Sequence, residues 1–127
     1  MSKILIDTDI LIDIARNIDK AIARLKKESK SNQLCISIIT QMELIIGCRN
    51  KQELFALEKF LQGFDILNID DSISQQAIQL RKTYNLSHSL LMADCFIAAT
   101  AIDRAIPLLS KNQKDYLFIK DLQLSTY

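Results

Sequence analysis

Short apolar runs alternate with segments of helical periodicity along the whole 127-residue chain. The first run, residues 3–6, is continuous and ends in polar residues, which is typical of a strand buried on both faces of a parallel sheet. Similar runs occupy residues 34–37, 64–68 and 106–109, and a weaker one occupies 118–122. This alternation predicts an α/β fold with three α/β/α layers around a central parallel sheet of about five strands.

Six helices are expected between and after these strands. Asp9 can cap the first helix through its side chain. Ser72 and Gln75 have the spacing of a capping box, and Ser87 or Ser89 can cap the last helix. The expected helices span residues 9–16, 18–25, 40–46, 52–61, 72–85 and 90–102.

The chain is long enough for one domain and no more. Its 127 residues, 49% apolar and 24% charged, can bury about two thirds of the unfolded surface. A net charge of +1 does not indicate a nucleic-acid binder, so any polyanion must be bound by local patches. The three cysteines lack disulfide or zinc spacing, and no run reaches the roughly 18 apolar residues of a membrane span. We therefore expect a soluble, cytoplasmic protein.

Three acidic residues lie in stretches that have almost no other charge. Asp7 follows the first predicted strand, Glu43 interrupts the apolar run 35–46, and Asp94 lies within the run 90–99. A carboxylate in apolar surroundings is costly unless it is hydrogen-bonded, paired or bound to a cation. Asp7 could instead be a helix N-cap, and each of the others could pair with a distant Lys or Arg. One divalent cation bound by all three carboxylates would explain why each of them lies in an apolar stretch.

A fourth polar stretch, residues 110–116, follows the predicted strand at 106–109. Because the carboxyl ends of parallel strands share one edge of the sheet, Ser110, Asn112 and Asp115 can reach the same edge as Asp7. The alternative is an ordinary polar turn. If residues 110–116 do lie at this edge, they add polar and acidic side chains to the pocket around Asp7.

Four stretches of the chain contain these acidic and polar residues: ILIDTDIL from residue 4, IITQMEL from residue 38, ADCFIAATA from residue 93 and SKNQKDY from residue 110. Together these stretches resemble the PIN-domain ribonucleases, and within them the VapC-type toxins of bacterial toxin–antitoxin pairs. The order, spacing and chain length agree from end to end, so the resemblance covers essentially the whole chain. It implies that residues 1–127 form a single PIN-like nuclease domain.

The resemblance implies an acidic site that binds Mg²⁺ or Mn²⁺. Two positions depart from the usual pattern, because Asp9 stands where Asn or Ser is more common and Ser110 replaces a Thr. The extra charge of Asp9 could alter metal affinity. Thr8 would orient Asp7 or a water, and Asn112 is the alternative to Asp115 at the variable fourth position. The residues that match the family's catalytic positions are Asp7, Thr8, Glu43, Asp94, Asn112 and Asp115, and the implied metal ligands are Asp7, Glu43, Asp94 and Asp115.

The implied activity is hydrolysis of RNA phosphodiester bonds by a metal-dependent endoribonuclease. The resemblance also implies a homodimer and a cognate antitoxin protein whose tail fills the acidic groove. The apolar residues between positions 54 and 61 are expected in the core rather than at such an interface. RNA phosphates would be bound by Lys20, Arg24, Lys26 and Lys27, unless these form an ordinary solvated helix face.

One rival class is the haloacid-dehalogenase-like phosphatases. Asp7 and Asp9 after a strand are similar to the D-x-D motif of that class. However, Leu11 stands where Thr or Val is expected, and the chain is short for that fold. This interpretation also leaves Glu43 without a role.

A second, non-enzymatic rival is a receiver-type signalling module. Its size and its strand–helix alternation are similar to those of this chain. Lys111 could serve as its strand-end lysine, and Asp65 or Asp70 would have to be its phosphorylated residue. This interpretation gives no role to Glu43 or Asp94.

Overall fold

Five parallel strands form the central sheet, which confirms the predicted α/β fold. The structure is a computed structural model that describes residues 1–127. The strand order is β3-β2-β1-β4-β5, so β1 is central and β2 and β4 lie on its two sides. Receiver-type folds have the order 2-1-3-4-5, which excludes that interpretation. The strands are β1 Ser2–Ile6, β2 Asn32–Ser37, β3 Asp65–Leu67, β4 Leu108–Leu109 and β5 Leu124–Ser125.

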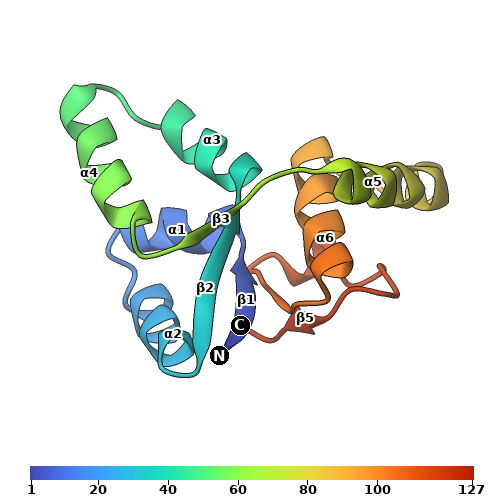
Figure 1. The fold of residues 1–127 in the computed structure, drawn as a ribbon, viewed down its shortest axis with the longest axis horizontal. Coiled ribbons are helices and arrows are strands. Elements are labelled where there is room, and N and C mark those ends of the chain that lie inside the picture. The colour runs from blue at the N-terminus through green and yellow to red at the C-terminus, as the bar shows by residue number, and fades with distance from the viewer.

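Six helices surround the sheet (Figure 1). Alternate side chains of β1 face opposite ways, so Ile4 and Ile6 join a core with α1, α2 and α4, whereas Leu5 joins a core with α5 and α6. β1 is therefore buried on both faces, as predicted. α3 begins directly after β2, at the carboxyl edge of the sheet. The helices are α1 Thr8–Ala15, α2 Asp19–Ser29, α3 Ile38–Ile46, α4 Lys51–Leu61, α5 Asp71–Tyr84 and α6 Met92–Arg104, with a short 3₁₀ helix, η1, at Gln113–Asp115.

The last strand is shorter and later than predicted. Residues 118–122 form turns, and β5 pairs with β4 only through Leu124 and Ser125. The apolar run was misleading because Ile119 is buried in the core without belonging to a strand. Burial alone therefore accounts for its apolar side chain.

Three predicted helix caps are wrong. Asp7, rather than Asp9, is the N-cap of α1. Asp70 caps α5 in place of Ser72. α6 begins at Met92 without a side-chain cap, so neither candidate serine caps it. The first correction matters for the site, because Asp7 both caps α1 and directly follows β1.

α3 and α4 are much less buried than their sequences predict. Thr40 is the buried residue of α3 and Leu61 that of α4. Ile46 is 81% exposed and Phe55 is 63% exposed, so the expectation that the apolar residues of α4 belong to the core is wrong for most of them. A groove of about 1010 Å³, lined mainly by apolar side chains, runs between α1, α3 and α4.

The three cysteines are free thiols. Cys35 and Cys95 are buried in the core, whereas Cys48 is partly exposed and lines the groove between α1, α3 and α4. None of the helices combines the length and the apolar character that crossing a membrane requires.

Candidate active site

Asp7 lies at the carboxyl end of β1, where the chain turns into α1 (Figure 1). Its Oδ1 accepts the Thr8 backbone N–H at 2.8 Å. Its Oδ2 accepts the Ser110 hydroxyl at 2.7 Å and lies 3.0 Å from the Tyr116 hydroxyl. Asp7 is only 5% exposed. Three uncharged donors therefore hold a buried carboxylate whose charge no cation neutralises.

Asp94, in the first turn of α6, reaches the same phenol. Its Oδ1 lies 3.1 Å from the Tyr116 hydroxyl, which is its only hydrogen-bond partner. A phenol has one hydrogen, so Tyr116 donates fully to only one carboxylate at a time. Both contacts are hydrogen bonds when Asp7 is protonated, because Asp7 then donates to the Tyr116 oxygen while the Tyr116 hydroxyl donates to Asp94. Two acids from distant parts of the chain thus share one buried hydroxyl.

Glu43 is linked to Asp7 through Thr8. The Thr8 hydroxyl donates to Glu43 Oε1 at 2.7 Å and lies 2.9 Å from the hydroxyl of Thr40. Because Thr8 has one hydroxyl hydrogen, it accepts from Thr40. The apolar run around Glu43 indicated buried surroundings, and this is wrong, since Glu43 is exposed and Thr40 is the buried residue of α3. α3 nevertheless brings Glu43 to the residue beside Asp7.

The loop after β4 closes around Asp9. Asp9 Oδ2 accepts the backbone N–H groups of Lys111 and Asn112, both at 3.1 Å, and lies 3.3 Å from the Ser110 hydroxyl oxygen. Its other oxygen, Oδ1, is buried without a hydrogen-bond partner. Such an oxygen is costly unless a cation or water satisfies it. Asp9 therefore brings a further carboxylate with an unused ligand atom to this edge.

Asn112 and Asp115 contribute to the site in different ways. Asn112 contributes its backbone N–H to Asp9, while its side chain is exposed. Asp115 is also exposed, and its charge lies close enough to help raise the pKa of Asp94. Asp115 thus adds negative charge to the site and Asn112 does not. The choice of Asp115 as the fourth acidic ligand stays a prediction.

Burial disfavours the charged forms of Asp7, Asp9 and Asp94, and repulsion between acids adds to this for Asp7 and Asp94. Burial, together with the charge of Asp9, raises the pKa of Asp7 to about 7, although the hydrogen bonds it accepts oppose this shift. Burial is also the main cause that raises the pKa of Asp9. Burial raises the pKa of Asp94, and nearby carboxylates add to the effect. The pKa of Tyr116 is raised by burial and by both acids it contacts, so its phenol stays protonated.

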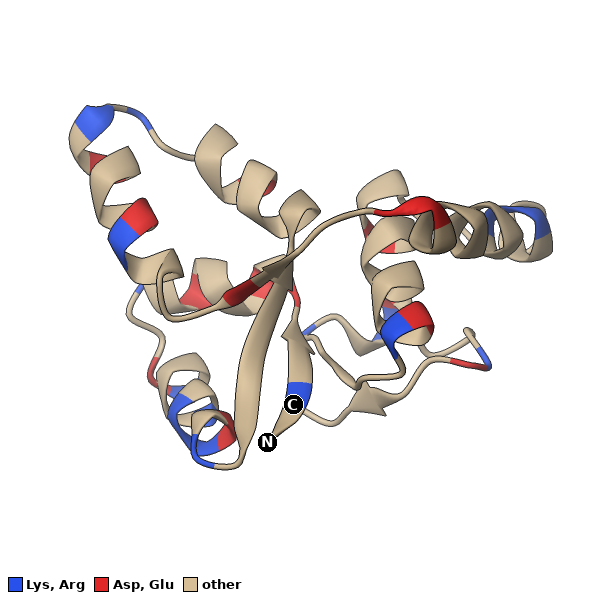
Figure 2. Cartoon of the chain, in the orientation of Figure 1, with Lys and Arg blue, Asp and Glu red and all other residues tan.

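No Lys or Arg neutralises these residues. The acidic cluster, as we call Asp7, Asp9, Glu43, Asp94 and Asp115, takes part in none of the ion pairs of the structure. Figure 2 shows Asp and Glu on α1, α3 and α6 around the end of β1, while Lys and Arg gather on α2. A counter-charge for the cluster must therefore come from outside the chain.

The basic residues of α2 lie away from the acidic cluster. The carboxyl end of α2 leads into β2 and so lies at the amino-terminal edge of the sheet (Figure 1). Arg24 pairs with Glu28, and the Lys20 ammonium lies 4.6 Å from the ring centroid of Tyr127. These two side chains are engaged within the protein, and a role for them in nucleic-acid binding stays a prediction.

The donor set of the acidic cluster fits a hard divalent cation. It offers carboxylate oxygens, nearby hydroxyls and the unpartnered oxygen of Asp9, and it has no internal counter-charge. As the side chains stand, no three carboxylate, histidine or cysteine groups are arranged to hold an ion. Binding would therefore require side-chain rotation, most easily by the exposed Glu43.

Sequence patterns did not reveal three side chains that hold the site together. Thr40 lies one helical turn before Glu43 on α3, and Asp13 lies on α1 with its carboxylate 3.0 Å from Lys111 Nζ. Helical spacing from an already recognised acid is a signal that could have found both. Tyr116 was part of a motif but had no assigned role. No local pattern indicates its contacts, because both of its partners are distant in sequence.

The metal-free protein should lose stability as the pH rises from about 5.5 to about 7.5. Folded Asp7 keeps its proton up to about pH 7, whereas the unfolded chain releases it near the ordinary pKa of 3.8. The folded state binds more protons in this window, so the free energy of unfolding should fall by about 2 kcal/mol. Thermal unfolding in EDTA measures this slope. Asp7→Asn should flatten the dependence of the free energy of unfolding on pH. An equally steep dependence in that variant would mean that other groups cause it.

The fold and the site together define a parallel α/β domain with carboxylates gathered beyond its strand ends. A family model described as PIN domain matches residues 4–119. The chain therefore belongs to the PIN-domain family. It is 35% identical to Ribonuclease VapC1 of Methanocaldococcus jannaschii over 99% of this chain and 88% of that protein, which places it among the VapC-type members of the family.

Solved structures agree with this assignment. The crystal structure of VapBC2 from Rickettsia felis, bound to a DNA fragment from its promoter, contains a chain with a TM-score of 0.88 and 25% identity, covering 98% of both chains. A toxin-antitoxin complex from Klebsiella pneumoniae gives a TM-score of 0.82 and 31% identity, covering 98% of this chain and 97% of that one. The PIN-like fold is confirmed, and the phosphatase interpretation has no support.

Proposed function

We propose that this chain is a divalent-metal-dependent endoribonuclease that acts in the cytoplasm as the toxin of a toxin–antitoxin pair. The observation that carries the proposal is the acidic cluster, which has no internal counter-charge. Similarity to a protein named Ribonuclease VapC1 over nearly the whole chain supports the reaction type. Similarity to chains of toxin–antitoxin complexes supports the partner.

The acidic cluster would hold Mg²⁺ or Mn²⁺. Asp7, Glu43, Asp94 and Asp115 are the proposed ligands, and the free oxygen of Asp9 is a further donor. The bound cation would lower the pKa of a water molecule and neutralise charge on the phosphodiester. Asp7 must give up its proton to serve as a ligand. Because its pKa is about 7, this deprotonation costs little free energy near neutral pH.

Thr8 would fix the two acids beside it. Its backbone N–H holds the Asp7 carboxylate, and its hydroxyl holds Glu43 Oε1. The exposed Glu43 then has its second oxygen available to take a proton from the attacking water. Asn112 would act through its N–H, which orients Asp9. These roles divide the site into a buried anchor at Asp7 and an exposed base at Glu43.

The apolar groove between α1, α3 and α4 is the proposed seat of the antitoxin. Leu57 and Phe60 line it, and Glu43 belongs both to its lining and to the acidic cluster. A partner segment with apolar side chains for the groove and a basic residue beside Glu43 would cover the acids and exclude RNA. Such a partner would also cover apolar side chains of α3 and α4 that the single chain leaves exposed.

The resemblance to the family also leads us to propose a homodimer. Light scattering of the purified chain measures its mass directly. A dimer mass supports this proposal, and a monomer mass at micromolar concentration contradicts it.

Digestion of total RNA by the purified chain tests the proposed activity. Fragments should accumulate when Mn²⁺ or Mg²⁺ is present, because the acidic cluster needs a cation to tolerate a phosphodiester. Excess EDTA should stop the reaction. Undiminished cleavage in EDTA would contradict the metal dependence, and intact RNA under every condition would contradict the nuclease assignment.

A further inference from the structure

The Tyr116 hydroxyl has contacts that core packing does not require. The ring is 1% exposed and packs in the core between the sheet, α5 and α6. A buried phenol usually finds one polar partner. This hydroxyl instead reaches Asp7 Oδ2 at 3.0 Å and Asp94 Oδ1 at 3.1 Å. It therefore joins the end of β1 to the first turn of α6.

Asp94 depends on this hydroxyl more than Asp7 does. Asp7 also accepts from the Thr8 N–H and the Ser110 hydroxyl. Asp94 accepts no other hydrogen bond and is only partly buried. Without the phenol, its carboxylate would be free to rotate toward solvent, whereas Asp7 would keep its orientation.

The loop that carries Tyr116 is itself well anchored. The Gln113 side-chain amide donates to the carbonyl oxygens of Ser110 at 2.7 Å and Ser125 at 3.1 Å. The Tyr116 N–H donates to the Gln113 carbonyl at 3.1 Å. A buried ring on an anchored loop gives the hydroxyl a fixed position, so it can act as a spacer between the two acids.

We propose that Tyr116 is a positioning residue that keeps Asp94 directed at Asp7, ready for a divalent cation. The inference rests on the proposed metal-dependent function and adds a residue to which that function assigns no role. Outer-sphere hydrogen bonds that orient metal ligands change metal affinity by about 10-fold to 100-fold. Loss of the hydroxyl alone should therefore weaken cation binding while the ring continues to fill the core.

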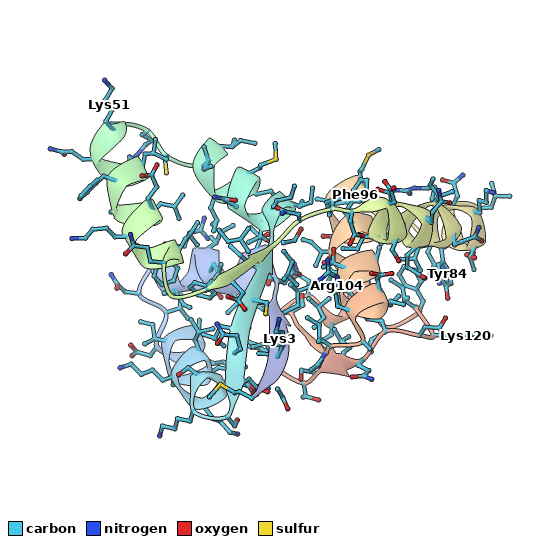
Figure 3. The ribbon with its side chains drawn as sticks, viewed as in Figure 1. Lys3, Lys51, Tyr84, Phe96, Arg104 and Lys120 are labelled. Atoms are coloured by element: carbon cyan, nitrogen blue, oxygen red, sulfur yellow. The ribbon has the colours of Figure 1, made fainter.

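The test compares Tyr116→Phe with Tyr84→Phe. Tyr84 is a matched control because its hydroxyl accepts the Lys120 N–H at 3.3 Å and lies with that residue at the far end of α5 (Figure 3). Mn²⁺ binding to the metal-free proteins can be measured by the loss of the free-Mn²⁺ electron paramagnetic resonance signal. The Kd of Tyr116→Phe should rise by about 10-fold to 100-fold. Tyr84→Phe should match the wild type, and both variants should unfold in EDTA near the wild-type temperature.

A second readout separates positioning from general damage. The Mn²⁺ concentration that gives half-maximal RNA cleavage should rise in Tyr116→Phe by the same factor as the Kd, while the rate at saturating Mn²⁺ changes less. Unchanged Mn²⁺ affinity in Tyr116→Phe would overturn the inference and leave the proposed function standing. Equal weakening in Tyr84→Phe would also overturn it. A wild type that binds no Mn²⁺ would overturn both the inference and the metal-dependent function.

Discussion

Asp94→Asn should lower the rate of RNA cleavage by roughly 1000-fold, because several kcal/mol of charge stabilisation are lost with one carboxylate ligand. The amide has nearly the shape of the carboxylate, and its oxygen can still accept from Tyr116. The substitution therefore removes a charge from the acidic cluster and keeps the packing around it. Initial rates at saturating Mn²⁺, together with thermal unfolding in EDTA, measure both effects.

Asp103→Asn is the matched control for this result. Asp103 lies on the same helix, α6, where its carboxylate accepts from Ser72 and lies beside Arg104 rather than in the acidic cluster. Its substitution should leave cleavage within about twofold of the wild type, since it removes a partly exposed ion pair. If Asp94→Asn kept more than a tenth of the wild-type rate, Asp94 would not be a metal ligand.

Mn²⁺ should raise the unfolding temperature of the wild-type protein by roughly 10 °C at 100 times its Kd. The reason is the unneutralised charge of the acidic cluster, in which burial raises the pKa values of Asp7, Asp9 and Asp94 and neighbouring acids raise those of Asp7 and Asp94 further. A cation that binds only the folded state relieves this repulsion. Scanning calorimetry with and without Mn²⁺ measures the shift.

Asp7→Asn should remove most of this stabilisation by Mn²⁺. The variant should unfold no earlier than the wild type in EDTA at neutral pH, because the amide places no charge in the buried site. The Asp103→Asn control should retain the full shift. An equal shift in Asp7→Asn would mean that Mn²⁺ stabilises the fold at some other place.

Local periodicity and strand-edge geometry were enough to predict the fold and part of the site. The continuous apolar run before Asp7 identified a strand buried on both faces, and β1 has that position. Parallel strands share one carboxyl edge, so the sequence placed Asp7 and Ser110 together, and they are hydrogen-bonded. Asp94 was recognised from the apolar run around it, and residues 97–101 of that helix are buried, although Asp94 itself is only partly buried.

The sequence could not reveal features that depend on tertiary contacts. An apolar helix normally indicates burial, but α3 exposes Ile46 and Met42 to solvent, so Glu43 was wrongly expected to be buried. An exposed apolar surface has the same sequence pattern as a buried core, because charged residues are absent from both. The bridge made by Tyr116 joins segments far apart in the chain and leaves no local pattern.

The most direct test of a cation at the acidic cluster is a crystal structure of the protein with Mn²⁺, with anomalous scattering recorded to locate the metal. We expect an anomalous peak bonded to the carboxylates of Asp7 and Asp94, with Glu43 or Asp115 turned toward it. A map without a peak at these carboxylates, at a Mn²⁺ concentration that supports cleavage, would contradict the account.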